Sequence, residues 1–438
     1  MSASLTLRFR GAVAALGAEG RRALLERTTA DDDVTRDTVT AIIDAVRHEG
    51  DSVLVSLARE YDGVSLKRLD VPAEACTRAL DALDPAVREA MERAARNIRA
   101  AHEAMRPQAV EVETEPGVVV GRRPDPLDRV GVYAPGGRAA YPSSVLMGAI
   151  PARVAGVREV IVCSPPGRDG LPSAPVLAAC ALAGVDRVFA VGGAGAVAAM
   201  AYGTRTVPRV DRIVGPGNAW VTEAKVQVAK ACAIDSPAGP SELLVIADAT
   251  ADVAAVAREL LAQAEHDPSA CVLAVCVGDD VAARVETAVE TMVGGYARAA
   301  IIRQALAEHG GVVSVASIAD AVTLANAYAP EHLLLAVDDA DAWLARVRHA
   351  GTVFVGAGAS VSFGDYMTGA NHTLPTNGLA RSYSGLGTLD FVRWTSWQRV
   401  TPAAAARLAD AVGTFADAEG LDGHARAARA WAHRGTQA

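Results

Sequence analysis

Two pairs of neighbouring residues have the types and spacing that catalysis or metal binding requires. Gln263 and His266 lie three apart near the end of a helix expected over 252–266, where an amide oxygen and an imidazole could hold one ion. Glu331 and His332 are adjacent, and a carboxylate beside an imidazole suits paired base chemistry on water and on an alcohol. Either pair alone is weak, because a histidine at a helix end often only meets the last carbonyl groups.

Two further groups lie nearer the C-terminus. Asp365 and His372 belong to a glycine-punctuated polar loop soon after the strand expected at 352–355, the kind of position where open α/β sheets bind ligands. Glu419 and His424 place a carboxylate and an imidazole in the C-terminal tail. Composition alone favours a surface position for His424.

Two glycine-rich loops are candidates for binding a cofactor. The run 193–198 follows an expected strand and loosely matches the dinucleotide fingerprint, which is a weak signal by itself. The run 215–218 also follows a strand, and its glycines would let the backbone approach a phosphate. Both loops are equally compatible with structural turns. The sequence has no GxxxxGK[ST] and no HExxH, which disfavours a P-loop enzyme and a zincin protease.

The elements that must position these residues alternate between strand and helix. Most of the short β-branched runs are followed by apolar residues at helical spacing, with strands expected at Glu159–Cys163, Arg187–Val191, Arg209–Val214, Glu242–Ala247, Cys271–Val277, Val312–Val315, His332–Val337 and Thr352–Val355. This alternation predicts an α/β fold with parallel sheets covered on both faces. Residues 31–100 read as helix-rich, and 386–438 as short helices with too few apolar residues for a core of their own.

Length and composition exclude several classes of protein. The chain has 438 residues, 51% of them hydrophobic and 21% charged, so it folds, and into more than one domain or subdomain. A net charge of −9 and only 4% aromatic residues argue against nucleic acid and anionic membranes as partners. The uncharged run 188–204 is glycine-rich and shorter than a spanning helix. We expect no export signal.

The six cysteines form no CxxC and no disulfide framework. They are therefore expected to be buried thiols, and the protein to be cytoplasmic.

Taken together, eight motifs in order over nearly the whole chain resemble those of histidinol dehydrogenase. Each motif alone is common in proteins, but the set in this order is specific for the family. The motifs are Val130–Gly137, Gly215–Asn218, Pro237–Glu242, Gln263–His266, Ala329–Leu333, Gly364–Tyr366, Asn371–Thr376 and Glu419–His424. The resemblance implies an enzyme that oxidises L-histidinol through L-histidinaldehyde to L-histidine, the last step of histidine biosynthesis, while two NAD molecules are reduced in turn.

The same resemblance implies the site residues. One Zn²⁺ per subunit is expected on four side chains: Gln263, His266, Asp365 and His424. An amide is an uncommon zinc donor, and the substrate's own nitrogens would take the shell beyond four ligands. The substrate is expected to contact these four residues together with Ser241, His332 and Glu419. His332 is the implied base for the alcohol proton, and Glu331 the implied base that activates water on the aldehyde, so no cysteine nucleophile is needed.

For NAD the resemblance points to Tyr133, Gly195 and Asn218. The usual family word is Val-Gly-Gly-Ala-Gln-Ala, and this chain has Gly195 where the family has the glutamine. We expect an active enzyme with a raised KM for NAD, which the substitution Gly195→Gln would lower.

The implied architecture consists of two incomplete Rossmann-like domains with mainly parallel sheets and small helical N- and C-terminal segments, like that of aldehyde dehydrogenases. We expect an N-terminal segment at 1–27, a first domain from 28–132 and 247–385, a second, NAD-associated domain at 133–246, and a dimerisation tail at 386–438. In the implied homodimer each tail reaches the partner's active site.

Three alternatives remain at this point. A relative could oxidise another polar alcohol, such as a sulfonated propanediol, with the same zinc and base residues. A zinc hydrolase is possible because a metal with a glutamate and a histidine can activate water. A non-catalytic nucleotide-binding protein is less favoured, since it would not need Glu331, His332 and four ligand-type residues.

Overall fold

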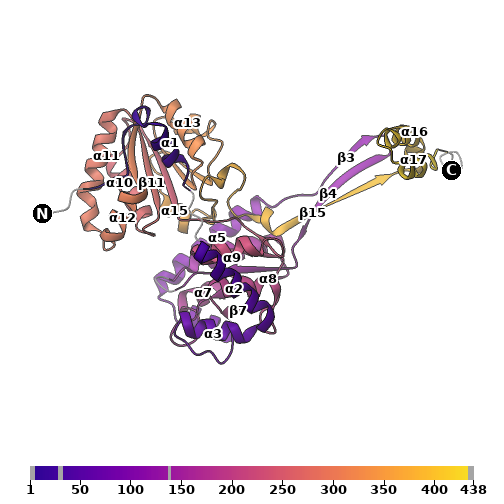
Figure 1. Cartoon of the computed structure of the whole chain (residues 1–438), viewed down its shortest axis with the longest axis horizontal. Coiled ribbons are helices and arrows are strands. Elements are labelled where there is room, and N and C mark those ends of the chain that lie inside the picture. Colours follow the sequence, from indigo (N-terminus) through magenta and orange to yellow (C-terminus); the bar gives the residue numbers. More distant parts are fainter. Residues whose placement is uncertain (1–4, 28–32, 137–139, 433–438) are drawn as a thin grey trace.

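The computed structural model describes residues 5–27, 33–136 and 140–432 of the chain. Figure 1 shows two α/β lobes beside each other and a long arm that carries the C-terminal helices away from both. In the first lobe the strand order is β1-β12-β11-β10-β13-β14, and in the second it is β2-β7-β6-β5-β8-β9. Among the described helices, none is long and apolar enough to cross a membrane.

The first lobe is built on a sheet in which all paired strands run parallel. Alternate side chains of β10 enter different cores, with Leu243 and Val245 on one face and Leu244 and Ile246 on the other. This two-sided burial explains its unbroken apolar sequence. The elements are β1 Phe9–Ala12, α1 Ala18–Leu25, β10 Glu242–Ala247, α10 Val253–Ala264, β11 Cys271–Val277, α11 Asp279–Met292, α12 Ala299–His309, β12 Gly311–Val315, α13 Ile318–Tyr328, β13 His332–Ala336, α14 Ala340–Leu344, β14 Thr352–Val355 and α15 Val361–Tyr366.

The second lobe has a parallel sheet with one antiparallel edge strand, β2. Small residues in α8, such as Ala196 and Ala198, are fully buried and allow this helix to pack closely on the sheet. The elements are α2 Asp33–Glu49, α3 Asp51–Tyr61, β2 Asp70–Val71, α4 Ala73–Asp81, α5 Pro85–Ala104, β5 Arg129–Tyr133, α6 Pro142–Ala155, β6 Glu159–Ser164, α7 Ala174–Ala183, β7 Arg187–Ala190, α8 Gly193–Tyr202, β8 Arg212–Val214, α9 Ala219–Val228 and β9 Ala233–Ile234.

The predicted α/β fold with parallel sheets is confirmed, but the grouping of segments into domains differs from the expected one. Residues 33–104 were expected with 247–385, whereas α2, α4 and α5 pack in the cores of the second lobe. The N-terminal segment is not separate, because β1 pairs with β12 at the edge of the first sheet. Helical periodicity shows that a helix has an apolar face, but not which of two similar sheets covers it.

The arm is a three-stranded antiparallel sheet made of β3 Val110–Glu115, β4 Val118–Pro126 and β15 Val392–Val400. At its tip, α16 Pro402–Ala418 packs against α17 Asp422–Arg429. The expectation of only short helices over 386–438 is therefore wrong for β15. Every residue of β3 is exposed, and polar or charged residues flank the tryptophans of β15, so neither strand has the buried apolar run that marks the strands of the lobes.

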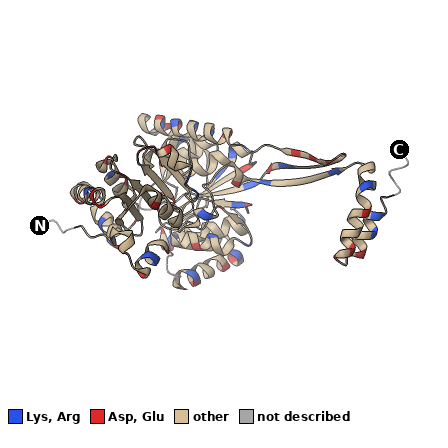
Figure 2. Ribbon diagram, turned by 90° about the horizontal axis from the view of Figure 1, so that it is seen from above, with Lys and Arg blue, Asp and Glu red and all other residues tan. Residues whose placement is uncertain are grey.

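Charge on the chain is mixed in sign. Figure 2 shows basic and acidic residues interspersed along the helices of both lobes and at the arm tip.

Candidate active site

The adjacent Glu331 and His332 lie at the amino end of β13, in the interior of the first lobe. Helix α13 ends at Tyr328, Ala329 takes a left-handed conformation with φ 51°, and Pro330 prevents the helix from continuing. This turn delivers both side chains to the start of the strand, where they are 6% and 4% exposed. The Nδ1 atom of His332 is 3.4 Å from Oε2 of Glu331.

The backbone of Glu242, on the neighbouring strand β10, holds both side chains. Its N–H donates to Oε2 of Glu331 at 2.7 Å, and its carbonyl oxygen lies 2.9 Å from Nδ1 of His332. Because a carbonyl only accepts hydrogen bonds, Nδ1 carries the proton and the lone pair of the neutral ring is on Nε2. Nε2 is buried without a hydrogen-bond partner in the described chain, and Oδ1 of Asp365 is 3.7 Å away. A free imidazole lone pair in a buried site is the arrangement of a general base.

The pKa values of this pair are coupled. Burial lowers the pKa of His332, but the charges of Glu331 and Asp365 outweigh burial and raise it to about 10. Burial raises the pKa of Glu331 above its ordinary value, although His332 opposes the shift. A cation bound at Asp365 would withdraw one of the two carboxylate charges and so lower the pKa of His332 toward the range in which a base works at neutral pH.

Asp365 lies on α15, 3.7 Å from Nε2 of His332, while Gln263 and His266 lie at the carboxyl end of α10. Gln263 is buried in the last turn of α10, and His266 lies two residues beyond the helix rather than inside it as expected. Burial raises the pKa of Asp365, but His332 and then the charges of His372 and His266 outweigh burial and lower it. These charges place Asp365 among three imidazoles.

Two side chains hold α15, the helix that presents Asp365. The N–H of Val361, at the start of α15, donates to Oε2 of Glu259 at 3.0 Å, and Glu259 is one turn before Gln263 on α10. At the other end, Nδ1 of His372 is 3.0 Å from the carbonyl oxygen of Asp365. Helices α10 and α15 are thus fixed to each other next to the donor residues.

The side chains of Gln263, His266 and Asp365 offer oxygen and nitrogen donors of the kinds that could hold a zinc ion. The imidazole and the carboxylate are usual zinc donors, and the amide oxygen of Gln263 is an uncommon one. Within residues 5–27, 33–136 and 140–432, no group of three His, Cys, Asp or Glu side chains is arranged for a metal by itself.

The candidate cofactor loops lie at the carboxyl edge of the second sheet. The hydroxyl of Tyr133, at the end of β5, accepts a hydrogen bond of 3.1 Å from the N–H of Gly193 at the start of α8. Gly215, after β8, has φ 116°, and a Cβ there would come 2.2 Å from the carbonyl oxygen of Tyr133, so only glycine fits. The side chain of the exposed Asn218 caps α9 by accepting from the N–H of Val221 at 3.1 Å.

A buried ion pair fixes the loop that begins at Gly215. Lys225 pairs with Asp235, and the two side chains are 2% and 5% exposed. Nζ of Lys225 donates to the carbonyl oxygen of Gly215 at 3.1 Å, and the N–H of Gly215 donates to Oδ2 of Asp235 at 2.8 Å. The loop conformation is thus set before any ligand binds.

The remaining predicted site residues are divided between two places. Ser241 is half-buried and directly precedes β10, next to Glu242, which is hydrogen-bonded to Glu331 and His332. Glu419, directly after α16, and His424, on α17, are exposed at the tip of the arm, far from the lobes of the same chain. In the described part of the chain these two residues therefore lie away from the site of their own subunit.

Gly195 lies under α3, which revises the expectation for Gly195→Gln. A Cβ at this position would be 2.9 Å from Cδ1 of Leu57 and 3.2 Å from Cδ2 of Leu54. We now expect Gly195→Gln to lower the free energy of unfolding by about 1–3 kcal/mol through overpacking, without lowering the KM for NAD. Thermal melting measures the change in stability, and titration with NAD measures the KM. The variant Gly195→Ala, which adds only a Cβ, should be destabilised less. A lower KM at unchanged stability would restore the original expectation.

The six cysteines are all buried free thiols, as expected. Burial raises the pKa of Cys232, Cys271 and Cys276 to about 12 and that of Cys163 and Cys180 further. Such thiols are not ionised at neutral pH and are poor nucleophiles.

Sequence reasoning missed Arg27, Glu242 and Glu259 as parts of the site. Glu242 reads as the charged first residue of an apolar strand, and Glu259 as a solvent-facing residue of an amphipathic helix. Arg27 carries no motif at all. His372 was noticed only as part of a polar loop, although its position one residue after Asn371 belongs to the word that carries the resemblance.

The first lobe contains the buried Glu331–His332 pair and side chains of types that can bind a metal. The second lobe has glycine loops at the carboxyl edge of its sheet. Together these features are typical of an α/β enzyme. A family profile described as histidinol dehydrogenase matches residues 25–431. Histidinol dehydrogenase from Halobacterium salinarum is 51% identical over 415 residues, covering 94% of this chain and 97% of the relative. That from Methanosarcina barkeri is 45% identical over 407 residues, covering 93% and 94%.

The fold agrees with these relatives. The crystal structure of histidinol dehydrogenase from Elizabethkingia anophelis superposes with a TM-score of 0.94 at 32% identity, covering 98% of this chain and 99% of that chain. The chain belongs to the histidinol dehydrogenase family and is an oxidoreductase of histidine biosynthesis.

Proposed function

We propose that this enzyme oxidises L-histidinol to L-histidine in two NAD-dependent steps at one site. In the first, the alcohol and NAD⁺ give L-histidinaldehyde, NADH and a proton. In the second, the aldehyde, water and another NAD⁺ give the carboxylic acid, NADH and a proton. The observation that supports this best is the buried Glu331–His332 pair, fixed on Glu242 with Nε2 of His332 free.

The two bases have separate tasks in this proposal. Nε2 of His332 accepts the hydroxyl proton as hydride leaves the same carbon for NAD. Glu331 accepts a proton from the water that attacks the aldehyde, and the hydrate then loses hydride to the second NAD. Burial raises the pKa of Glu331, which makes its carboxylate a stronger base than an exposed one.

Zinc is proposed to bind Gln263, His266 and Asp365, together with His424 of the partner subunit. When bound, zinc would hold the imidazole and amino nitrogens of the substrate and so orient the alcohol carbon. The same four residues, with Ser241, His332 and the partner's Glu419, make up the proposed substrate site. Glu419 is suited to the cationic amine.

NAD is proposed to bind the carboxyl edge of the second sheet. Tyr133, Gly195 and Asn218 are the proposed contact residues, although the burial of Gly195 under α3 limits it to contact through its backbone. The preformed loop at Gly215 supports this placement, because a fixed backbone can approach a pyrophosphate closely.

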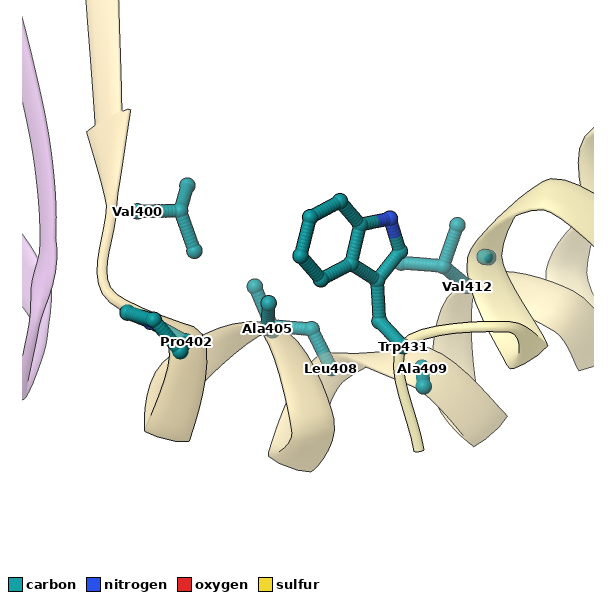
Figure 3. A pocket seen from close by; sticks show the side chains of 8 residues that line it. Val400, Pro402, Ala405, Leu408, Ala409, Val412 and Trp431 are labelled. Atoms are coloured by element: carbon teal, nitrogen blue, oxygen red, sulfur yellow. The ribbon is translucent and has the colours of Figure 1, made fainter. Parts of the chain in front are cut away.

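The enzyme is proposed to be a homodimer in which the arm carries Glu419 and His424 to the partner's site. The separation of α17 from its own lobes supports this arrangement. An apolar groove of about 410 Å³ lies at the arm tip, lined by Val400, Pro402, Ala405, Leu408, Ala409, Val412, Ala428 and Trp431 (Figure 3). Val412 and Trp431 are 46% and 44% exposed there, which suits cover by a second copy. The buried cysteines suit a reducing cytoplasm, where we propose the enzyme works.

The stoichiometry of NADH on L-histidinol tests the function. We expect two NADH per L-histidinol with the zinc-loaded protein and loss of turnover when a chelator removes the metal. If the protein oxidises a different polar alcohol, such as a sulfonated propanediol, but not L-histidinol, it is a dehydrogenase of that alcohol instead. Hydrolysis without NAD would refute the proposal.

A further inference from the structure

Behind the catalytic pair lies a buried ion pair that the proposed mechanism does not use. The guanidinium of Arg27 donates from Nε and Nη2 to the two carboxylate oxygens of Glu242, at 2.7 and 3.0 Å. The two side chains are 5% and 0% exposed. Arg27 also lies over the ring of Tyr328, 3.4 Å from its centre. Both charges are therefore held in one geometry by planar, two-pronged contacts.

Glu242 contacts the catalytic pair through its side chain and its backbone. Its Oε2 accepts the N–H of Glu331 at 3.3 Å, and its Oε1 accepts the N–H of Asn377 at 3.0 Å. Its own N–H and carbonyl hold the side chains of Glu331 and His332, as described above. Each catalytic residue thus has at least one hydrogen bond to Glu242, and Glu331 has two.

Burial of an ion pair is an expensive way to stabilise a fold. Apolar residues of similar volume often serve as well or better, because two charges must be removed from water. Arg27 lies two residues beyond the end of α1, so a flanking segment has to be drawn into the interior to supply the charge. The directional contacts to Glu331 give this costly arrangement a function.

We propose that Arg27 and Glu242 are positioning residues for the Glu331–His332 pair and that they act mainly on the second oxidation. Arg27 fixes the carboxylate of Glu242, and Glu242 fixes Glu331 at both its backbone and its side chain. The inference rests on the proposed role of Glu331 as the base for aldehyde hydration. The Arg27–Glu242 ion pair is thereby linked to the hydration of the aldehyde, the step in which Glu331 is the base.

The test compares the two oxidations in Arg27→Met. Among the described residues, Arg27 contacts both Glu242 and Tyr328 at the end of α13, so Glu242→Gln is needed to assign a selective effect to Glu242. We expect the rate with L-histidinaldehyde to fall roughly 10- to 100-fold, the effect of a small misplacement of a reacting group, and the rate of the first oxidation to fall less. NADH per L-histidinol should drop below two, and semicarbazide should trap aldehyde. Glu242→Gln should behave alike, and Arg27→Lys should recover part of the loss.

The ratio of the two rates does not depend on how much of the protein is folded, so a destabilised variant still gives an answer. Arg129→Met is the matched control, because Nε of Arg129 pairs with Oε2 of Glu159 at 2.6 Å in the second lobe. It should leave the ratio unchanged. If Arg27→Met and Glu242→Gln lower both rates equally, the pair is only structural and the inference is wrong. If the unmodified enzyme itself fails to give two NADH, the proposed function is wrong instead.

Discussion

Replacing His332 with asparagine will lower kcat for L-histidinol by about 10²- to 10⁴-fold, the usual contribution of a general base. Asparagine can still donate a hydrogen bond to the carbonyl of Glu242, as Nδ1 of His332 does at 2.9 Å. It has no group that can accept the alcohol proton in place of Nε2. Zinc content and the KM for NAD should change little, so steady-state kinetics together with metal analysis isolates the loss of the base.

A matched control for this variant is His102→Asn. His102 is also 4% exposed, and its Nδ1 contacts the carbonyl oxygen of Ile98 at 2.8 Å, in the second lobe. Its replacement removes a buried imidazole outside the site. Activity per folded molecule should stay within a few-fold of the unmodified enzyme. A kcat for His332→Asn within tenfold of that enzyme would show that His332 is not the base.

Mixing two inactive homodimers will restore activity if the tail works in the partner's site. His424→Ala lacks the tail donor, and His332→Ala lacks the base, so each protein alone should be nearly inactive. After subunit exchange at equal amounts, about a quarter of all sites would combine an intact body with an intact tail, by the statistics of a symmetric dimer. Activity should rise to roughly that fraction, measured as NADH formation from L-histidinol.

The control for this experiment mixes two variants of the body, His332→Ala and Asp365→Ala. In that hybrid each site still contains one defect, whichever chain supplies the tail, so no activity should return. Exchange itself is followed with differently tagged subunits. Verified exchange without recovery in the His424→Ala mixture would show that the tail does not act in the partner.

Much of the fold could be predicted because most strands of the two lobes are short apolar runs, several of them almost fully buried. Glu242–Ala247, Cys271–Val277 and Thr352–Val355 have the expected bounds, since runs of β-branched residues between parallel helices leave little ambiguity. The arm could not be predicted in this way. Its strands supply no buried residue to the described apolar cores, and they are held by pairing between segments nearly 300 residues apart in sequence, as Val118 with Val400 shows.

The residues of the candidate site were predicted from their types and from the resemblance, but the residues that hold them in place were not. Glu331, His332 and Asp365 lie close together in the first lobe, and His266 acts electrostatically on Asp365. That Gln263 joins them stays a prediction. The catalytic pair lies at the amino end of β13, whereas the carboxyl end is the usual expectation for open α/β sheets. Glu242 can hydrogen-bond to Glu331 and His332 because the register of β10 and β13 places Leu243 opposite His332. Register between distant strands is a tertiary property that no local pattern reveals.

The pairing of β1 with β12 has a consequence for synthesis on the ribosome. All described strands of the second lobe lie between Asp70 and Ile234, so its sheet can close before the rest of the chain is made. Phe9, which pairs with Gly311, must wait for a partner that emerges roughly 15–60 s later at ordinary elongation rates. For that interval β1 has no strand to pair with on the nascent chain, and the lobe that holds Glu331 and His332 closes after the other lobe.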